Sequence, residues 1–383
     1  MSEAVELLRQ LVAINSINPD LVPGSAGEGE IARFVANWLE RAGIEVQFDE
    51  PTPGRPNVVG IVRGSGGGRS LLLNAHMDTV GVEGMERPHD PFVAGNRLYG
   101  RGAYDMKGGL AAIMLTAAAA KKRALRGNLI ITAAVDEEYA SIGTNSILKR
   151  WHADAAIVTE PTELDICTAH KGFIWIALET FGRAAHGSRP DLGVDAIAKM
   201  GKVLVGLEQL DKSLRSAPFH PLLKSGSIHA SLIEGGQELS SYPARCLLSV
   251  ERRTIPGETQ QDAESEVRQV LDQAAASDPD FKASMKTTLI RAPFEVAKYA
   301  LIVKTVRRHA ATLLEHEPTI VGSSAWMDSA LLSAAGIPTV VFGPGGAGAH
   351  EVVEWADLDQ VERCSEILLA VAEEFCASET ASP

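Results

Sequence analysis

Two residues that could bind a metal ion, His76 and Asp78, follow the apolar run Leu71–Leu73 in this 383-residue chain. Side chains at positions i and i+2 of a strand point the same way, so Asp78 could accept a hydrogen bond from one ring nitrogen of His76 and leave the other nitrogen for a metal. Open α/β sheets bind their ligands at the carboxyl ends of strands, where this pair would stand. Alone, such a pair is more often structural.

A carboxylate, Asp105, lies in the glycine-rich stretch Tyr99–Gly109, directly before an expected helix. Glycines allow unusual dihedral angles and close backbone approach, which a merely solvated loop does not need. A phosphate-binding loop is the competing interpretation, but the spacing of Gly and Lys-Ser/Thr is absent and an acid stands where the anion would bind. The stretch therefore favours a functional carboxylate.

Further apolar segments end in residues of the same kind. One runs into Asp136-Glu137-Glu138, another ends at Glu160, and a third opens a glycine-rich loop that closes with His350. An acid run is as often solvated surface as part of a site, so none of these segments is decisive alone.

The joint pattern is more specific than its parts, because separate segments each deliver a metal-ligand side chain at a similar place. The set contains two histidines and three carboxylates, namely His76, Asp105, Glu138, Glu160 and His350. This is the donor set expected for a pair of zinc ions with one bridging acid. The scattered cysteines form no Cys-x-x-Cys pair, so neither a thiolate site nor a disulfide framework is indicated.

The elements that must position these residues alternate between strand and helix, which predicts an α/β fold: a mostly parallel sheet with helices on both faces. We expect strands at 58–62, 70–75, 128–135, 155–158 and 339–342, and helices at 109–120, 300–314, 329–335 and 357–375. The Gly64–Gly68 stretch is expected to form a hairpin turn between two strands.

A smaller α+β block interrupts this pattern. We expect its strands at 173–180, 227–233 and 245–251 and its helices at 194–210 and 259–275. The predicted organisation is therefore a discontinuous domain, 1–172 and 291–383, with an inserted domain at 173–290.

Composition narrows the class of protein. The length allows two domains, and 45% hydrophobic with 22% charged residues is typical of a globular chain. A formal net charge of -13 argues against a nucleic-acid partner, which would need a basic surface. We find no uncharged apolar run long enough to span a membrane and no secretion-signal pattern, which predicts the cytoplasm.

In the order and context of these motifs, the whole chain resembles the zinc-dependent amidohydrolases and exopeptidases that include acetylornithine deacetylase, succinyl-diaminopimelate desuccinylase, carboxypeptidase G and aminoacylase. The resemblance implies a zinc-exopeptidase-like catalytic domain, an inserted ferredoxin-like lid that is also the dimer interface, and a homodimer. It also implies two Zn²⁺ per subunit, for which Co²⁺ or Mn²⁺ could substitute.

Carried over by position, the resemblance assigns His76 and Glu160 to one ion, Glu138 and His350 to the other, and Asp105 to both as the bridge. Asp78 would orient His76, and Glu137 would be the general base. The peptide bond from Asp105 to Met106 would be cis.

The resemblance extends to the insert and the last glycine-rich loop. His186 would stabilise the oxyanion in the neighbouring subunit, and Arg253 would bind the substrate carboxylate together with the loop that holds Gly345 and Gly346. Ser240 stands where the family usually has asparagine, so its shorter side chain weakens the expected substrate contact.

The predicted function is hydrolysis of the amide bond in an N-acyl amino acid or a related small molecule with a free carboxylate. Dipeptidase or carboxypeptidase activity is the alternative within the family. A catalytically silent metal-binding protein is the alternative from another class, and retention of Glu137 argues against it.

Overall fold

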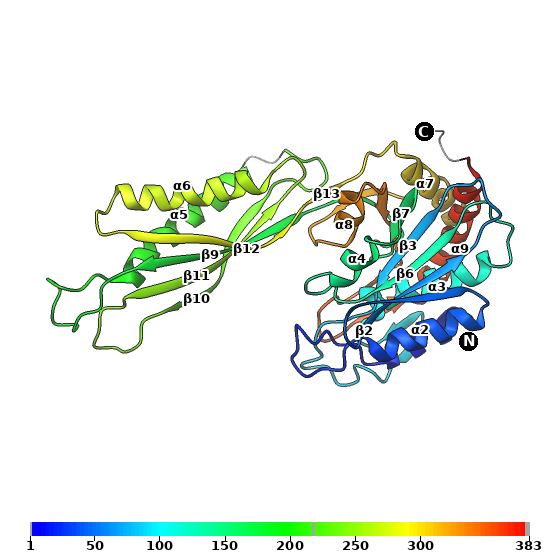
Figure 1. Ribbon diagram of the computed structural model, residues 1–383, viewed down its shortest axis with the longest axis horizontal. Helices are drawn as coiled ribbons and strands as arrows, with labels where there is room; N and C mark the ends of the chain where they lie inside the picture. The colour runs from blue at the N-terminus through cyan, green and yellow to red at the C-terminus, as the bar shows by residue number, and fades with distance from the viewer. Residues whose placement is uncertain (1, 217–218, 380–383) are drawn as a thin grey trace. The chain divides into compact units, whose positions relative to one another are not determined.

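The computed structural model describes residues 2–216 and 219–379, which divide into two compact units (Figure 1). The first unit runs to Thr168 and also takes in Val296–Val321 and the chain from Met327 on. The second unit comprises Ala169–Glu295 and Gly322–Trp326. Each unit has its own apolar core.

The first unit is built on a sheet in the order β1-β2-β6-β3-β7-β15-β8, with β14 paired to β8; β13, whose residues belong to the second unit, pairs with the end of β8. Its central strands β6, β3, β7 and β15 run parallel, whereas β1 with β2, β2 with β6, β15 with β8 and β8 with β13 pair antiparallel. The predicted fold class is therefore confirmed. The strands are β1 (Glu45–Thr52), β2 (Arg55–Val62), β3 (Leu71–His76), β6 (Leu129–Ala134), β7 (Ala155–Val158), β8 (Ile166–His170), β13 (Phe294–Glu295), β14 (Ile320–Ser323) and β15 (Thr339–Val341).

Strands β3 and β6 are buried at every position. Parallel strands covered on both faces read as continuous apolar runs, which is why the sequence shows them clearly. Since β6, β3 and β7 are parallel neighbours, their carboxyl ends meet at one edge of the sheet. The residues that follow these strands are thereby brought together.

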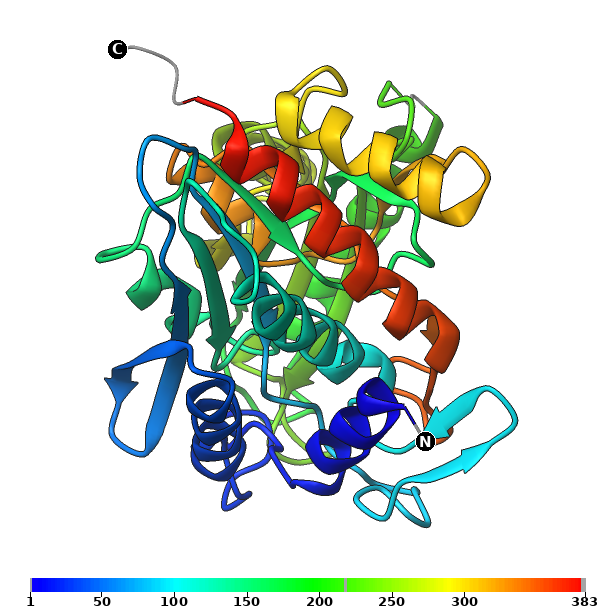
Figure 2. The same ribbon diagram turned by 90° about the vertical axis from the view of Figure 1, so that its right-hand side faces the viewer.

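Helices cover both faces of this sheet. On one face α3 and α9 lie side by side, and α1, α2 and α7 pack around them (Figure 2). On the other face α4 and α8 contact the strands and each other. The helices are α1 (Glu3–Ala13), α2 (Gly29–Arg41), α3 (Gly108–Ala120), α4 (Ile142–Ile147), α7 (Leu301–Leu314), α8 (Ser329–Ala334) and α9 (Leu358–Ala377).

Helix α3 is apolar on all sides, and α9, α1 and α2 surround it. A helix without a polar face must lie in the core, as α3 does. A short kinked segment, η1 (Ala103–Lys107), leads into α3 and carries Asp105, where the main chain leaves helical dihedral angles. The Asp105–Met106 peptide bond is cis, as expected.

One expected connection is wrong. Gly64–Gly68 does not turn a hairpin between β2 and β3, because β6 lies between those strands and pairs with both. A local turn signal does not reveal a strand that arrives later in the chain. A small sheet in the order β16-β17-β5-β4 was also not expected; its strands are β4 (Phe92–Ala94), β5 (Arg97–Tyr99), β16 (Gly346–Ala347) and β17 (Trp355–Asp357).

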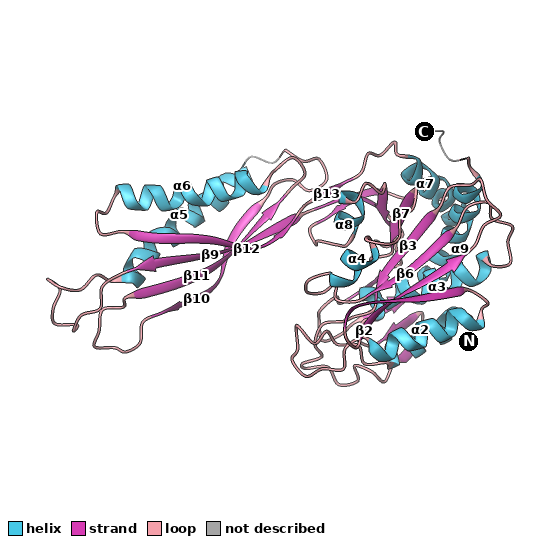
Figure 3. Cartoon of the chain, in the orientation of Figure 1, coloured by secondary structure: helices cyan, strands magenta, loops and turns pink. Residues whose placement is uncertain are grey.

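The second unit is a four-stranded antiparallel sheet in the order β10-β11-β9-β12, with α5 and α6 on one face (Figure 3). The chain order is strand, helix, strand, strand, helix, strand, which is the ferredoxin-like arrangement. Its elements are β9 (Gly172–Phe181), α5 (Ala196–Ser216), β10 (Ser227–Gly235), β11 (Arg245–Thr254), α6 (Gln260–Ala276) and β12 (Lys282–Arg291). The strand β12 was not among the expected elements.

Among the described residues, no helix has the length and apolar character needed to cross a membrane.

Candidate metal centre

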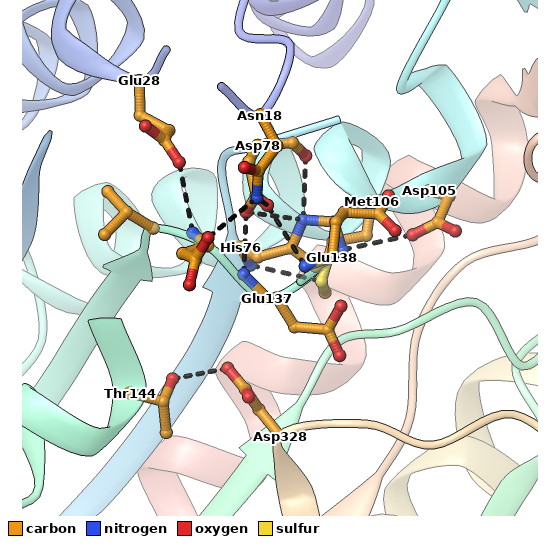
Figure 4. Close-up of polar contacts among 12 residues, drawn as sticks. Asn18, Glu28, His76, Asp78, Asp105, Met106, Glu137, Glu138, Thr144 and Asp328 are labelled. Atoms are coloured by element: carbon orange, nitrogen blue, oxygen red, sulfur yellow. Dashed lines mark hydrogen bonds and ion pairs between the residues drawn. The ribbon is translucent and has the colours of Figure 1, made fainter. Parts of the chain in front are cut away.

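The centre forms at the carboxyl ends of the parallel strands (Figure 4). His76 is the last residue of β3, Glu138 lies four residues past the end of β6, and Glu160 lies two residues past the end of β7. Asp105 comes from η1, and His350 from the loop between β16 and β17. The sheet order therefore gathers side chains that are far apart in sequence.

The carboxylate of Asp105 lies between the two histidines. Its Oδ1 is 3.2 Å from Nε2 of His76, and its Oδ2 is 3.4 Å from Nε2 of His350. A carboxylate whose two oxygens face different nitrogen donors has the disposition that a bridging ligand requires.

Each histidine has a glutamate of its own. Nε2 of His76 is 3.6 Å from Oε1 of Glu160, and Nε2 of His350 is 3.1 Å from Oε2 of Glu138. The two groups share Asp105 and otherwise use different residues. The structure thus brings all five predicted ligand residues together.

Possible ligand atoms also come close together in two groups of three residues, and one of these groups includes Glu137. His76, Glu137 and Glu160 form one group within 4.8 Å, and His76, Asp105 and Glu138 form another. Glu137 is therefore close enough to the first group that its role, base or ligand, needs an experiment.

Buried carboxylates set the electrostatics of the centre. Burial raises the pKa of Glu137, Glu138 and Glu160, and the neighbouring acids add to the effect. Hydrogen bonds to Asp105 and Glu138 raise the pKa of His350 to about 10. Burial lowers the pKa of His76, but Glu160 and Asp105 outweigh burial and raise it well above its usual value. Such a concentration of negative charge favours bound cations.

Asp78 acts differently from the simplest expectation. Nδ1 of His76 lies 3.0 Å from the backbone carbonyl of Asp78 and 3.6 Å from its carboxylate, so the main chain is the closer partner. The Asp78 carboxylate instead accepts the backbone N–H groups of Glu137 and Glu138, both at 3.1 Å. Asp78 therefore holds the segment that carries both glutamates.

A buried polar network lies behind Asp78 (Figure 4). The side-chain amide of Asn18 donates to Asp78 at 2.8 Å and to Asp136 at 3.0 Å. The guanidinium of Arg55 contacts Asp136 at 3.0 Å and Glu28 at 2.5 Å. The sequence analysis missed this network, because Asp136 stood out only as part of an acid run and no local pattern connects Asn18 with it.

Two further acids beside the centre were missed. Asp328 accepts a hydrogen bond from Thr144 at 2.5 Å, and burial raises its pKa to about 6. Glu354 is almost fully buried and accepts the backbone N–H of Asp105 at 3.0 Å. The only sequence signal for Glu354 is an acid directly after Val352-Val353, in the loop that follows His350.

The predicted substrate residues of the second unit lie in two places. Exposed His186 has its Nδ1 2.8 Å from Oγ of Ser188, and Gly187 beside it donates its N–H to the carbonyl of Ser240. Arg253 on β11 lies over the ring of Phe173, 5.3 Å from its centroid. Thus His186 and Ser240 share a pair of adjoining loops, and Arg253 belongs to the sheet.

The glycine-rich loop before His350 is tied down internally. Gly346 donates its N–H to Glu163 at 3.0 Å, and the Gly345 carbonyl accepts the N–H of Asp357 at 2.9 Å. A Cβ at Gly345 would lie 2.0 Å from a carboxylate oxygen of Glu163, so a larger residue there would have to push that side chain aside. A substrate contact to the Gly346 amide would have to displace Glu163.

Comparison with known proteins agrees with this geometry. The model of peptidase family M20/M25/M40 matches residues 72–374. The chain belongs to this family. Among curated relatives of this M20-family hydrolase, the N-formyl-4-amino-5-aminomethyl-2-methylpyrimidine deformylase of Bacillus subtilis (strain 168) is 29% identical, with 98% of this chain and 95% of the relative covered. The acetylornithine deacetylase of Proteus mirabilis (strain HI4320) is 30% identical, with 98% of each covered.

A solved structure shares the fold of this M20-family hydrolase. A dinuclear metal-binding peptidase of the M20 family from Bacillus subtilis superposes with a TM-score of 0.76 at 18% identity, covering 97% of both chains. At that identity the likeness shows a common architecture. The M20-family assignment therefore rests on the family match and on the curated relatives.

Proposed function

We propose that this M20-family hydrolase cleaves the amide bond of an N-acyl amino acid or a related small carboxylate at a dinuclear zinc centre. The observation that carries the proposal is the position of Asp105 between two pairs, His76 with Glu160 and His350 with Glu138. That pattern suits one bridging acid and two separate ions.

The residues fit such a pair of ions. Two imidazoles and three carboxylates are borderline-to-hard donors, which suit Zn²⁺ and also accept Co²⁺ or Mn²⁺. Oε1 of Glu138 is buried without a hydrogen-bond partner among the described residues, which is costly unless a cation binds nearby. Glu160 would complete the first ion with His76, and Asp105 would bridge both.

When bound, two such ions lower the pKa of a water molecule and polarise a carbonyl oxygen. Glu137 would accept the proton of the attacking water and return it to the leaving nitrogen. Asp78 holds the main chain of Glu137 and so fixes where its carboxylate can reach.

Substrate recognition is assigned to the second unit and the glycine-rich loop. Arg253 would bind the substrate carboxylate, because a guanidinium offers two parallel donors to it. His186 would donate a hydrogen bond to the developing oxyanion. Gly345 and Gly346 would line the part of the site that binds the substrate carboxylate. Ser240 would contact the substrate less readily than an asparagine, because its side chain is shorter.

We also propose a cytoplasmic homodimer formed through the second unit. The edge strand β10 exposes Leu232 and Ile233, which are 71% and 53% accessible, and neighbouring α5 exposes Val205 at 55%. An apolar patch on a free strand edge favours pairing with another chain. A second copy of this chain would cover it.

The decisive experiment is a substrate panel on protein of measured metal content. N-acetyl, N-formyl and N-succinyl amino acids would be compared with dipeptides after loading with Zn²⁺. We expect the acyl amino acids to be preferred, in line with the acetylornithine deacetylase among the relatives. Preference for dipeptides would favour a peptidase, and no hydrolysis with two ions bound would contradict the proposal.

A further inference from the structure

We propose that Glu354 and Arg101 are positioning residues that join the loop of Asp105 to the loop of His350, and that they mainly retain the ion bound by His350. The proposal rests on the dinuclear centre described above. The side chains of Glu354 and Arg101 bond to the two loops and to each other. Both residues would therefore act by positioning the ligand residues.

Glu354 organises the main chain that ends at Asp105. Its Oε1 accepts the backbone N–H groups of Tyr104 and Asp105, both at 3.0 Å. Its Oε2 accepts the N–H of Gly102 at 2.9 Å and the guanidinium of Arg101 at 2.6 Å. With 1% of its surface exposed, this carboxylate has no water to replace those donors.

The loop is shaped to wrap around Glu354. Gly102 has a φ of 77°, and a Cβ there would lie 2.7 Å from Cγ2 of Thr79. Gly100 donates its N–H to the carbonyl of Glu354 at 3.1 Å. The main chain and side chain of one glutamate therefore fix the whole approach to Asp105.

Arg101 extends this control to His350. Its guanidinium donates to the carbonyl of Glu351, the next residue, at 2.9 Å, and to the carbonyl of Gly81 at 3.1 Å. His350 itself has a φ of 62° and a side chain that is 55% exposed. Because burial does not fix this side chain, its position depends on its contacts with Asp105 and Glu138 and on the main chain that Arg101 holds.

The other ligands have independent supports. His76 is part of β3, Glu160 lies two residues past the end of β7, and Glu138 is held by Asp78. Loss of Glu354 should therefore spare the pair His76 and Glu160 and disturb His350 and the shared Asp105. The two metal affinities should therefore change unequally. The ion held by His76 and Glu160 should stay bound, and the affinity for the ion held by His350 should fall.

The test is metal binding by the Glu354→Gln variant of the full-length protein. Glutamine keeps the shape of the side chain. Its amide N–H₂ group, however, would face N–H groups that Glu354 accepts, and the negative charge opposite Arg101 would be lost. Titration with Zn²⁺ and with Co²⁺, followed by calorimetry and visible absorption, should show one equivalent at wild-type affinity and a second weakened by about 10- to 100-fold. The pattern should match that of His350→Ala and differ from that of His76→Ala.

Glu351→Gln is the matched control, because Glu351 is the exposed acid of the same loop, and it should bind both ions like the wild type. If Glu354→Gln does not fold, as circular dichroism would reveal, Arg101→Lys replaces it, since lysine keeps the charge but cannot reach Glu354 and Glu351 together. Two ions at wild-type affinity in the folded variant, or equal weakening of both, would overturn this inference. A wild-type protein that binds fewer than two ions would instead refute the dinuclear centre.

Discussion

The carboxylate of Asp78 accepts the backbone N–H of Glu137, with Oδ1 3.1 Å from the nitrogen. Its Oδ2 accepts the N–H of Glu138 at 3.1 Å and the side-chain amide of Asn18 at 2.8 Å. All of these donors need an acceptor, and a carboxylate can serve them because it has no hydrogen to donate. One acid thus orders the candidate base and a candidate ligand together.

Asp78→Asn should therefore impair the centre although it is nearly isosteric. One of the two oxygens becomes an N–H₂ group that faces a backbone donor, so the segment of Glu137 and Glu138 must shift. We expect a loss of about 10- to 100-fold in activity or metal affinity. Steady-state kinetics and metal titration would measure it, with Asp90→Asn, an exposed acid paired with Arg87, as the control. Wild-type behaviour would show that Asp78 has no such role.

The Glu137→Gln variant tests whether Glu137 is the general base or a metal ligand. If Glu137 transfers the proton, turnover should fall by about 100- to 10,000-fold while two ions remain bound per subunit. Single-turnover kinetics together with elemental analysis would test this. Glu138→Gln is the matched comparison and should lose metal. Loss of an ion in Glu137→Gln would make Glu137 a ligand, as its proximity to His76 and Glu160 allows.

His186→Ala tests whether the second unit acts on the neighbouring subunit. Neither His186→Ala nor Glu138→Ala should be active alone, but hybrid dimers combine an intact metal site with an intact His186. Random mixing makes about half of the dimers hybrid with one working site each, so about a quarter of wild-type activity should return. Subunits would be mixed after reversible dissociation and assayed. A mixture as inactive as its components would place His186 in its own subunit's reaction or outside the reaction.

The ion pairs of Asp278 predict a pH-dependent stability of the second unit. Its carboxylate contacts the ammonium groups of Lys199 at 2.6 Å and Lys202 at 2.7 Å. Hydrogen bonds from these lysines hold the pKa of Asp278 below its usual range. A carboxyl group with a lowered pKa in the folded state stabilises the fold above its unfolded pKa, and this contribution is lost as the pH falls.

Asp278→Asn should accordingly lower the thermal midpoint at pH 7, and the difference from the wild type should shrink below about pH 4. Scanning calorimetry at several pH values would show it. Asp280→Asn, at an exposed acid two residues away, should leave the midpoint unchanged. A difference that stays constant from acid to neutral pH would rule out the ionic contribution.

The sequence by itself was sufficient for the fold class, because fully buried parallel strands and apolar helices leave continuous local signals. Strand β7 was predicted with its observed bounds, and α3 to within one residue. The candidate residues could also be selected, because histidines and acids directly after apolar runs are chemically conspicuous. Strand β1, which has one buried residue, and the edge strand β12, which alternates in exposure, carried weaker signals and were missed.

Only the tertiary structure decided how those residues meet. That β6 inserts between β2 and β3 depends on pairing between distant segments, and no local turn signal contains it. The same holds for the contacts of Asp105 with His76 and His350. It also holds for the backbone N–H groups that Asp78 accepts and for the hydrogen bonds of Glu354 to the loop of Asp105. Hydrogen bonds across more than fifty residues follow from the order of strands in the sheet, and that order is set by packing of the whole core.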